Sequence, residues 1–292
     1  MRIKPGAERA LLLLPGLALV IAVVGLPVLR VLALSFTRVD LDGGVSTHWA
    51  GFGSYARLWQ DGRWWIALRN TALFVTMSVA LESGLGIAFA LALHRTRARK
   101  ALRAIVLVPW ALPTAVMSLA WAWIFNDSFG VLNDLLRRLG LLAAPIAWLG
   151  EPRTAMFAMV LADAWKTTPF VALVVLAGLQ GIPEELIDAA RVDGLTAGQR
   201  LRHVVLPLLA PSILVAVVFR VMQACGAFDV VYVMTGGGPG GSTETVSLYA
   251  FQNYFRYLDF SYASAIAIQG MLFAAATAVA IVWLGRRWQG TA

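Results

Sequence analysis

A few charged side chains lie inside long apolar runs of the sequence, where they could form ion pairs or face a polar solute. They include Glu82, Asp163, Lys166, Arg220 and Asp229. A charged side chain in an apolar environment is costly unless it is paired, so such residues either pair with one another or serve a function. Asp163 and Lys166 are one helical turn apart and form the most direct candidate pair. The sequence leaves both interpretations open.

The other reactive residue types are too sparse to indicate a metal or catalytic site. Cys225 is the only cysteine, and His48, His94 and His203 are scattered along the chain. No Walker-type Gly-Lys-Ser/Thr motif, carboxylate pair or nucleophile–base arrangement is evident, and the run TGGGPGG at 235–241 lacks the lysine of a phosphate-binding loop. We therefore expect no catalytic activity, metal or cofactor in this chain, and we interpret the glycine run as a turn.

The composition places the elements that carry these residues in a membrane. The chain has 292 residues, of which 59% are hydrophobic and 14% charged, and its mean hydropathy is +0.73. A soluble protein of this composition would expose too much apolar surface, whereas about 20 apolar residues suffice for one spanning helix. We predict an all-α polytopic membrane protein, one domain over 1–292, with six transmembrane helices at about 10–34, 70–93, 103–125, 155–178, 206–233 and 262–284.

Basic residues are concentrated on one side of these predicted spans. That side includes Arg2 and Lys4 near the N-terminus and the cluster RTRARK at 95–100. The positive-inside rule therefore places both termini in the cytoplasm. We expect the chain in the inner membrane of a prokaryotic cell. The same distribution explains the net charge of +8 better than nucleic-acid binding does, because nucleic-acid binding needs a basic cluster on one solvated face.

A polar segment on the predicted cytoplasmic side, 179–205, lies between the fourth and fifth spans and has the signals of two short helices joined by a turn. Pro183 suits the first position of a helix. Gly194 suits the left-handed position just past a helix end. Thr196 and Gln199 have the spacing of a capping box for a second helix. We call this segment the elbow and predict that it is folded.

The elbow also contains a spaced motif. Asp188-Ala189-Ala190 is followed by three residues, Gly194, nine residues, and Val204-Val205-Leu206-Pro207. The two alanines would leave a shallow face on the first elbow helix. The pattern resembles the cytoplasmic signature loop of permease subunits in binding-protein-dependent ABC importers, in which the first residue is Glu. Asp188 keeps the charge but is shorter by one methylene, which would weaken a salt bridge to an ATPase.

Four further segments, in the same order along the chain, extend the resemblance. They are 11–37, with its closing Ser-Phe-Thr, 165–186, 228–245 with FDVVYVMTGGGPGG, and YASAIAI at 262–268. Each is similar to a segment of the carbohydrate-uptake branch of that family, in the maltose-type first permease subunit. The resemblance therefore covers most of the chain.

The resemblance implies a role for each part of the sequence. It implies that the elbow docks on a separate ATPase subunit and couples ATP hydrolysis to inward movement of a sugar or similar polyol by alternating access. The residues implied for coupling are Glu184, Asp188, Ala189, Ala190, Gly194, Leu206 and Pro207. Candidates for the solute path are Trp165, Lys166, Arg220, Gln223, Phe228, Asp229 and Tyr232.

The implied partners are a second permease subunit, two cytoplasmic ATPase subunits that bind ATP and Mg, and an extracytoplasmic solute-binding protein.

Two other functions compete with that of an ABC importer permease. A self-sufficient secondary transporter would use the intramembrane charges, but no inverted repeat is evident. A membrane enzyme would have its site in the external loops, but no acid–base cluster is evident there.

Overall fold

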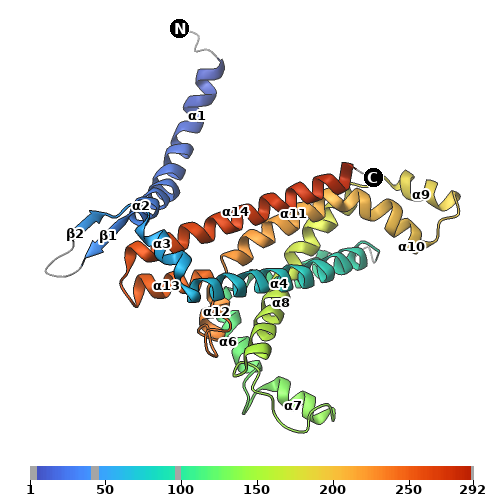
Figure 1. Ribbon diagram of the computed structural model, residues 1–292. Coiled ribbons are helices and arrows are strands. Elements are labelled where there is room, and N and C mark those ends of the chain that lie inside the picture. The colour runs from blue at the N-terminus through green and yellow to red at the C-terminus, as the bar shows by residue number, and fades with distance from the viewer. Residues whose placement is uncertain (1–4, 41–45, 96–99, 291–292) are drawn as a thin grey trace. The chain divides into compact units, whose positions relative to one another are not determined.

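The structure, a computed structural model, describes residues 5–40, 46–95 and 100–290 (Figure 1). Its helices are α1 Pro5–Val20, α2 Leu26–Ser35, α3 Gly53–Gln60, α4 Gly62–Arg95, α5 Lys100–Ala111, α6 Thr114–Ile124, α7 Val131–Arg138, α8 Pro152–Gln180, α9 Glu184–Val192, α10 Ala197–Arg200, α11 Leu206–Cys225, α12 Asp229–Met234, α13 Val246–Phe255 and α14 Phe260–Gly290. Wider π turns at Ile21–Gly25 and Leu201–Val205 continue α1 into α2 and α10 into α11. The basic residues Arg2, Lys4, Arg97 and Arg99 lie outside the described residues.

The helical membrane class is confirmed. Five helical segments of the described chain are long and apolar enough to cross a membrane, namely Leu13–Ser35, Gly62–His94, Pro152–Gln180, Ala197–Cys225 and Phe260–Arg287. A bent pair, Ala104–Ala111 and Thr114–Ile124, brings the number to six if it is counted as one broken span.

Two of the predicted spans differ from the structure. The predicted span 103–125 consists of two helices, α5 and α6, with a bend of 93° between them. Pro113 caps α6 there, and proline disfavours helical backbone at the residue before it, so the helix breaks at this point. The predicted span 206–233 begins earlier, at Ala197, and ends at Cys225, after which α12 is a separate short helix.

The chain divides into two compact units, 1–64 with 249–271 and 65–248 with 272–292. The division falls inside α4, α13 and α14, so the prediction of one domain over 1–292 stays a prediction. The first unit contains a feature that the all-α prediction missed. Strands β1 Thr37–Asp40 and β2 Ser46–Trp49 pair antiparallel, with Thr37 opposite Trp49.

A half-buried carboxylate holds the helices of the first unit together. Asp61, just after α3, accepts hydrogen bonds from the hydroxyls of Tyr249 in α13 and Tyr262 in α14, the latter at 2.5 Å. Arg57 of α3 forms an ion pair with Asp259 at 2.6 Å. These bonds tie the segment after the hairpin to the ends of α13 and α14.

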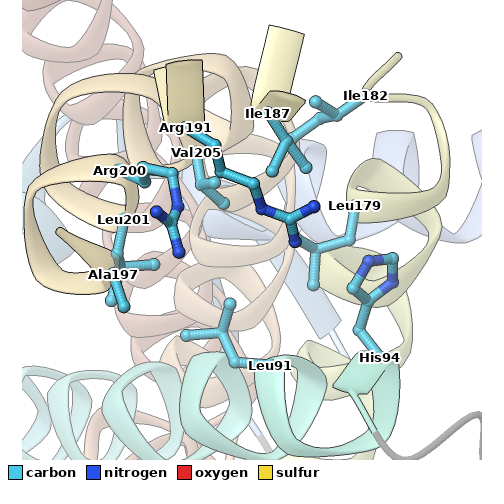
Figure 2. A pocket seen from close by; sticks show the side chains of 10 residues that line it. All are labelled: Leu91, His94, Leu179, Ile182, Ile187, Arg191, Ala197, Arg200, Leu201 and Val205. Carbon is cyan, nitrogen blue, oxygen red and sulfur yellow. The ribbon is translucent and has the colours of Figure 1, made fainter. Parts of the chain in front are cut away.

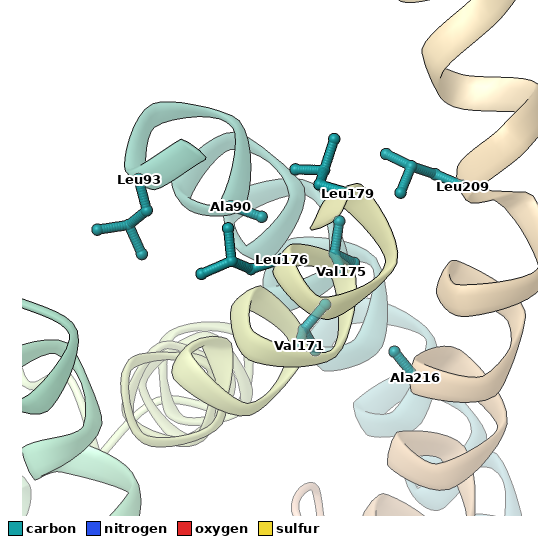
Figure 3. Packing of buried hydrophobic residues seen from close by; sticks show 8 residues of the cluster. All are labelled: Ala90, Leu93, Val171, Val175, Leu176, Leu179, Leu209 and Ala216. Carbon is teal, nitrogen blue, oxygen red and sulfur yellow. The ribbon is translucent and has the colours of Figure 1, made fainter. Parts of the chain in front are cut away.

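The core of the second unit forms around α8. Figure 3 shows Val171, Val175, Leu176 and Leu179 of α8 between side chains of α4 and α11. The glycine Gly178 allows α11 to approach closely, because a Cβ there would lie 2.3 Å from Ser212 Oγ. The elbow helices α9 and α10 lie at the end of α11 opposite to α12 (Figure 1). The core therefore positions both the elbow and the polar residues deeper along α8 and α11.

Candidate functional site

The first elbow helix, α9, begins one residue later than predicted. Pro183 is its cap, with φ −60° and ψ 133°, and Glu184 is the first helical residue. Glu184 and Glu185 then occupy the first turn, where the helix dipole favours negative charge.

The turn between the elbow helices is fixed by local hydrogen bonds, as the sequence predicts. Gly194 has φ +80°. Its N–H donates to Arg191 O at 3.0 Å, and the N–H of Leu195 donates to Ala190 O at 3.1 Å. These two bonds are those of a Schellman motif. Thr196 and Gln199 then form the reciprocal capping box of α10. The elbow is therefore a defined shape and not a slack connection.

The two alanines of the motif face opposite ways. Ala189 is exposed, but Ala190 is only 6% exposed and packs inside the chain. The expectation that both form one outer face is therefore wrong. In an α-helix, neighbouring residues are about 100° apart, so the inner edge of the exposed face can fall between the two. Asp188 is exposed and forms an ion pair with Arg191 at 2.7 Å.

The outward face of α9 includes apolar side chains that the motif does not identify. Val192 is 88% exposed and Leu186 45% exposed. Where α11 begins, Leu206 is half-buried and Pro207 is exposed. The elbow thus presents an acidic and apolar outer face on a base that packs on the spans.

A second feature is a polar cavity of about 260 Å³ deeper in the second unit. Of the predicted path residues, Lys166, Arg220, Gln223, Phe228 and Asp229 line it. The lining also includes residues that were not predicted for the path, among them Trp110, Thr114, Asp163 and Thr167. Trp110 and Thr114 reach the cavity because the chain breaks between α5 and α6, and Pro113 was the sequence signal for that break.

Trp165 and Tyr232 were predicted for the path but are not among the lining residues. Trp165 packs edge-on against Trp121, with ring centroids 5.7 Å apart. Tyr232 stacks on Phe228, with ring centroids 5.2 Å apart, and Phe228 is a lining residue.

One wall of the cavity is a buried ion-pair network centred on Arg220. Its Nε donates to Glu82 Oε2 at 2.7 Å and its Nη2 donates to Asp163 Oδ2 at 3.0 Å. Its Nη1 donates to Gln223 Oε1 at 2.6 Å. Glu82, Asp163 and Arg220 are 0%, 7% and 3% exposed. Ser78 and Thr167 donate further hydrogen bonds to the two carboxylates.

The structure therefore confirms pairing of these charges inside the bundle, but with different partners. Asp163 pairs with Arg220 of another helix and not with Lys166. Lys166 is half-buried, and its Nζ donates to Trp110 O at 3.2 Å. In the described part of the chain, no group of three or more His, Cys, Asp or Glu side chains could hold a metal ion.

Known proteins with similar sequences point to one family. Residues 82–290 match the profile of the family described as binding-protein-dependent transport system inner membrane component. The trehalose/maltose transport system permease protein MalF of Thermococcus litoralis is 41% identical, over 94% of this chain and 92% of that protein. The sulfoquinovosyl glycerol transport system permease protein SmoG of Agrobacterium fabrum is also 41% identical, over 94% of this chain and 88% of that protein.

A solved structure shows the same fold. The permease chain in the crystal structure of a bacterial alginate ABC transporter, in complex with its alginate-pentasaccharide-bound periplasmic protein, superposes with a TM-score of 0.81 at 22% identity, covering 99% of both chains. The family profile, which matches most of the sequence, and the 41% identical relatives show that the chain belongs to the inner-membrane permease components of binding-protein-dependent ABC importers.

Proposed function

We propose that the chain moves a sugar or similar polyol-type solute inward by alternating access, driven by a separate ATPase subunit that binds the elbow. The observation that carries the proposal is the elbow itself, a short folded helix pair with an exposed acidic and apolar face. Exposed apolar side chains on a short helix, such as Val192, gain stability when a partner covers them.

The elbow has the mechanical properties that coupling needs. Ala190 packs on its inner side, and the hydrogen bonds around Gly194 fix its turn. The elbow can therefore transmit a movement of its outer face to the spans as a rigid body. Asp188 and Ala189 are exposed on the outer face, with Glu184 at its start. Leu206 and Pro207 stand where the elbow continues into α11. Asp188 is already paired with Arg191, so an ATPase would have to compete for that carboxylate.

The polar cavity suits a neutral, hydroxylated solute. Lys166, Gln223 and Asp229 offer donors and acceptors, while Trp110 and Phe228 offer aromatic faces. Arg220 is paired with two buried carboxylates, so it adds no net positive charge to the cavity. The similarity to permeases named for trehalose, maltose and sulfoquinovosyl glycerol supports the sugar class.

The proposal includes an assembly and an orientation. The chain is one permease domain of a heterodimer, with two cytoplasmic ATPase subunits that bind ATP and Mg and an extracytoplasmic binding protein that delivers the solute. No cofactor is held by this chain. Both termini lie in the cytoplasm, as the distribution of basic residues indicates.

The substitution Gly194→Val tests the coupling role. A β-branched side chain is strained at φ +80°, so the turn must open and the elbow lose its shape. Gly198→Val is the matched control, because that glycine is in α10 with nothing within 4 Å of a Cβ. We expect ATP-driven uptake in vesicles to fall roughly tenfold or more for Gly194→Val, a loss of about 1.4 kcal/mol of coupling, and to change little for Gly198→Val.

The same assay decides between this proposal and secondary transport. Uptake that persists after ATP depletion but collapses with the ion gradient would favour secondary transport through the intramembrane charges. Normal uptake by the Gly194→Val variant would contradict the coupling role of the elbow.

A further inference from the structure

A second cavity lies between the elbow and the ends of the spans, on the inner side of α9. Its volume is about 200 Å³. Figure 2 shows Arg191 reaching over the cavity, with Arg200 on one side and His94 on the other. These three side chains come from α9, α10 and α4, so the cavity joins both elbow helices to a span.

The lining has one sign of charge. Two guanidinium groups and an imidazole face the cavity, and no carboxylate is among its lining residues in the described chain. The Nη1 of Arg191 donates to Asp188 Oδ1 at 2.7 Å in an exposed ion pair, and its other N–H groups have no hydrogen bond within the described residues. Arg200 donates one hydrogen bond, from Nη1 to Leu195 O at 2.6 Å, and forms no ion pair within the described residues. An arginine has five N–H donors, so most of those of Arg200 are available.

The volume of the cavity and its other lining residues indicate which class of ligand fits. Sites for drug-sized ligands occupy roughly 300–1,000 Å³, so this cavity suits a small anionic group and not a whole sugar or nucleotide. Arginine forks match the oxygens of a phosphate group. The rest of the lining is apolar, including Leu91, Leu179 and Val205. Basic pockets beside apolar helix ends on the cytoplasmic side bind phosphate headgroups.

We propose that this cavity binds a phosphate group, held by Arg191, Arg200 and His94. The phosphate belongs to an anionic phospholipid headgroup or to a small soluble phosphate ester. Once bound, it braces α9 and α10 against the end of α4, so the anion stiffens the elbow. The site is distinct from the polar cavity, and its occupancy does not depend on the identity of the transported solute.

The test is binding to the purified, assembled transporter in neutral detergent, followed by native mass spectrometry and thermal unfolding. One arm adds dioleoyl phosphatidylglycerol, with dioleoyl phosphatidylcholine as the control lipid. The other arm adds glycerol 3-phosphate. Stabilisation by phosphatidylglycerol alone assigns the lipid source, and stabilisation by glycerol 3-phosphate alone assigns the soluble source. Stabilisation by both shows that the phosphate group suffices without the acyl chains. The proposal is overturned if neither anion binds.

Matched variants show whether the bound anion occupies this cavity. Arg200→Gln removes a lining guanidinium, whereas Arg202→Gln removes an exposed one two residues away that does not line the cavity. We expect roughly tenfold weaker binding or more for Arg200→Gln, the loss of a charge-assisted hydrogen bond, and unchanged binding for Arg202→Gln. His94→Gln provides a second test that leaves the Arg200–Leu195 bond intact. Equal losses for Arg200→Gln and Arg202→Gln would show attraction to general surface charge and refute the site.

Discussion

At the scale of single residues, Arg220 is the centre on which the buried charges depend. It is bonded to both Glu82 and Asp163 while almost wholly buried, and Glu82 Oε1 has no partner of its own among the described residues. Removing the cation leaves two carboxylates buried without compensation, and breaking a buried pair in this way costs about 3–5 kcal/mol. We expect Arg220→Gln to lower the thermal stability of the detergent-purified transporter by an amount of that order.

Two further variants isolate the ion pair. Lys166→Gln removes a cation from the same cavity without breaking an ion pair with Asp163, and it should leave stability nearly unchanged. Adding Glu82→Gln and Asp163→Asn to Arg220→Gln should recover part of the loss, because the uncompensated charges are then gone. Strict additivity of the three changes would show that the groups are not coupled.

Asp61 makes the first unit sensitive to acid. Burial alone would raise the pKa of this carboxyl, but hydrogen bonds from Tyr249, Tyr262 and the backbone N–H of Arg63 outweigh burial and hold the pKa below its ordinary value. A carboxyl whose pKa is lower in the folded state contributes stability above its unfolded pKa and loses it as the pH falls through the folded pKa.

The prediction is therefore a loss of stability on acidification below about pH 4, the ordinary pKa range of aspartate. The Asp61→Asn variant should be less stable than the parent at neutral pH, and the difference should shrink towards pH 3. Hydrogen exchange of the amides in α13 measures this locally. A constant difference from pH 7 to pH 3 would contradict the role of the ionised carboxylate.

At the scale of elements, the contact of α8 with α11 depends on a glycine. A Cβ at Gly178 would lie 2.3 Å from Ser212 Oγ and 2.7 Å from its Cβ, so Gly178→Ala must push the two helices apart. Overpacking of this kind typically costs about 1–3 kcal/mol. Gly84→Ala in α4 is the control, because nothing lies within 4 Å of a Cβ there. Thermal unfolding should show the loss for Gly178→Ala only.

A second substitution distinguishes the clash from other effects of alanine. Ser212→Gly in the Gly178→Ala background removes the two nearest atoms that the new methyl group meets and leaves only Leu209 Cδ2, at 3.2 Å, of the three nearest. We expect this double variant to recover only part of the stability lost by Gly178→Ala, because a glycine inside α11 itself costs about 1 kcal/mol. Failure to recover would mean that the helices are not held at the distance that the structure shows.

The elements also show which features the sequence could predict. The elbow was predictable almost to the residue, because Gly194, Thr196 and Gln199 act through bonds to near neighbours in the chain. Pro113 itself is a local signal for the helix break, but the continuous hydropathy of 103–125 favoured a single span. The hairpin at Thr37–Asp40 and Ser46–Trp49 lies in a loop between two apolar runs, and the pattern of apolar runs gives no sign of these short strands.

The cavity was harder to predict because its residues come together through packing. Arg220 and Glu82 are 138 residues apart in the chain, and nothing in either apolar run specifies which charge the other will face. The spacing of Asp163 and Lys166 within one helix predicted a pair, because the sequence does not show which side chains of other helices lie nearby. Lys166 instead reaches the backbone of Trp110, which is positioned by a helix break.

At the scale of the whole molecule, the orientation and the ATPase contact can be tested together by cysteine labelling. The native Cys225 is buried, so an introduced cysteine should be the main reactive thiol. Val192→Cys places a thiol on the outer face of the elbow, where the parent side chain is 88% exposed. Trp49→Cys places one on the hairpin, where the parent side chain is 76% exposed.

A membrane-impermeant maleimide should label Val192→Cys only in inside-out vesicles and Trp49→Cys only in right-side-out vesicles. Adding the ATPase subunits should protect the elbow thiol, because docking covers the outer face of α9, and should leave the hairpin thiol reactive. Protection depends on contact and not on hydrolysis, so it should persist with a non-hydrolysable nucleotide. Labelling of the elbow from the outside would reverse the topology, and unchanged labelling with bound ATPase would place the coupling contact elsewhere.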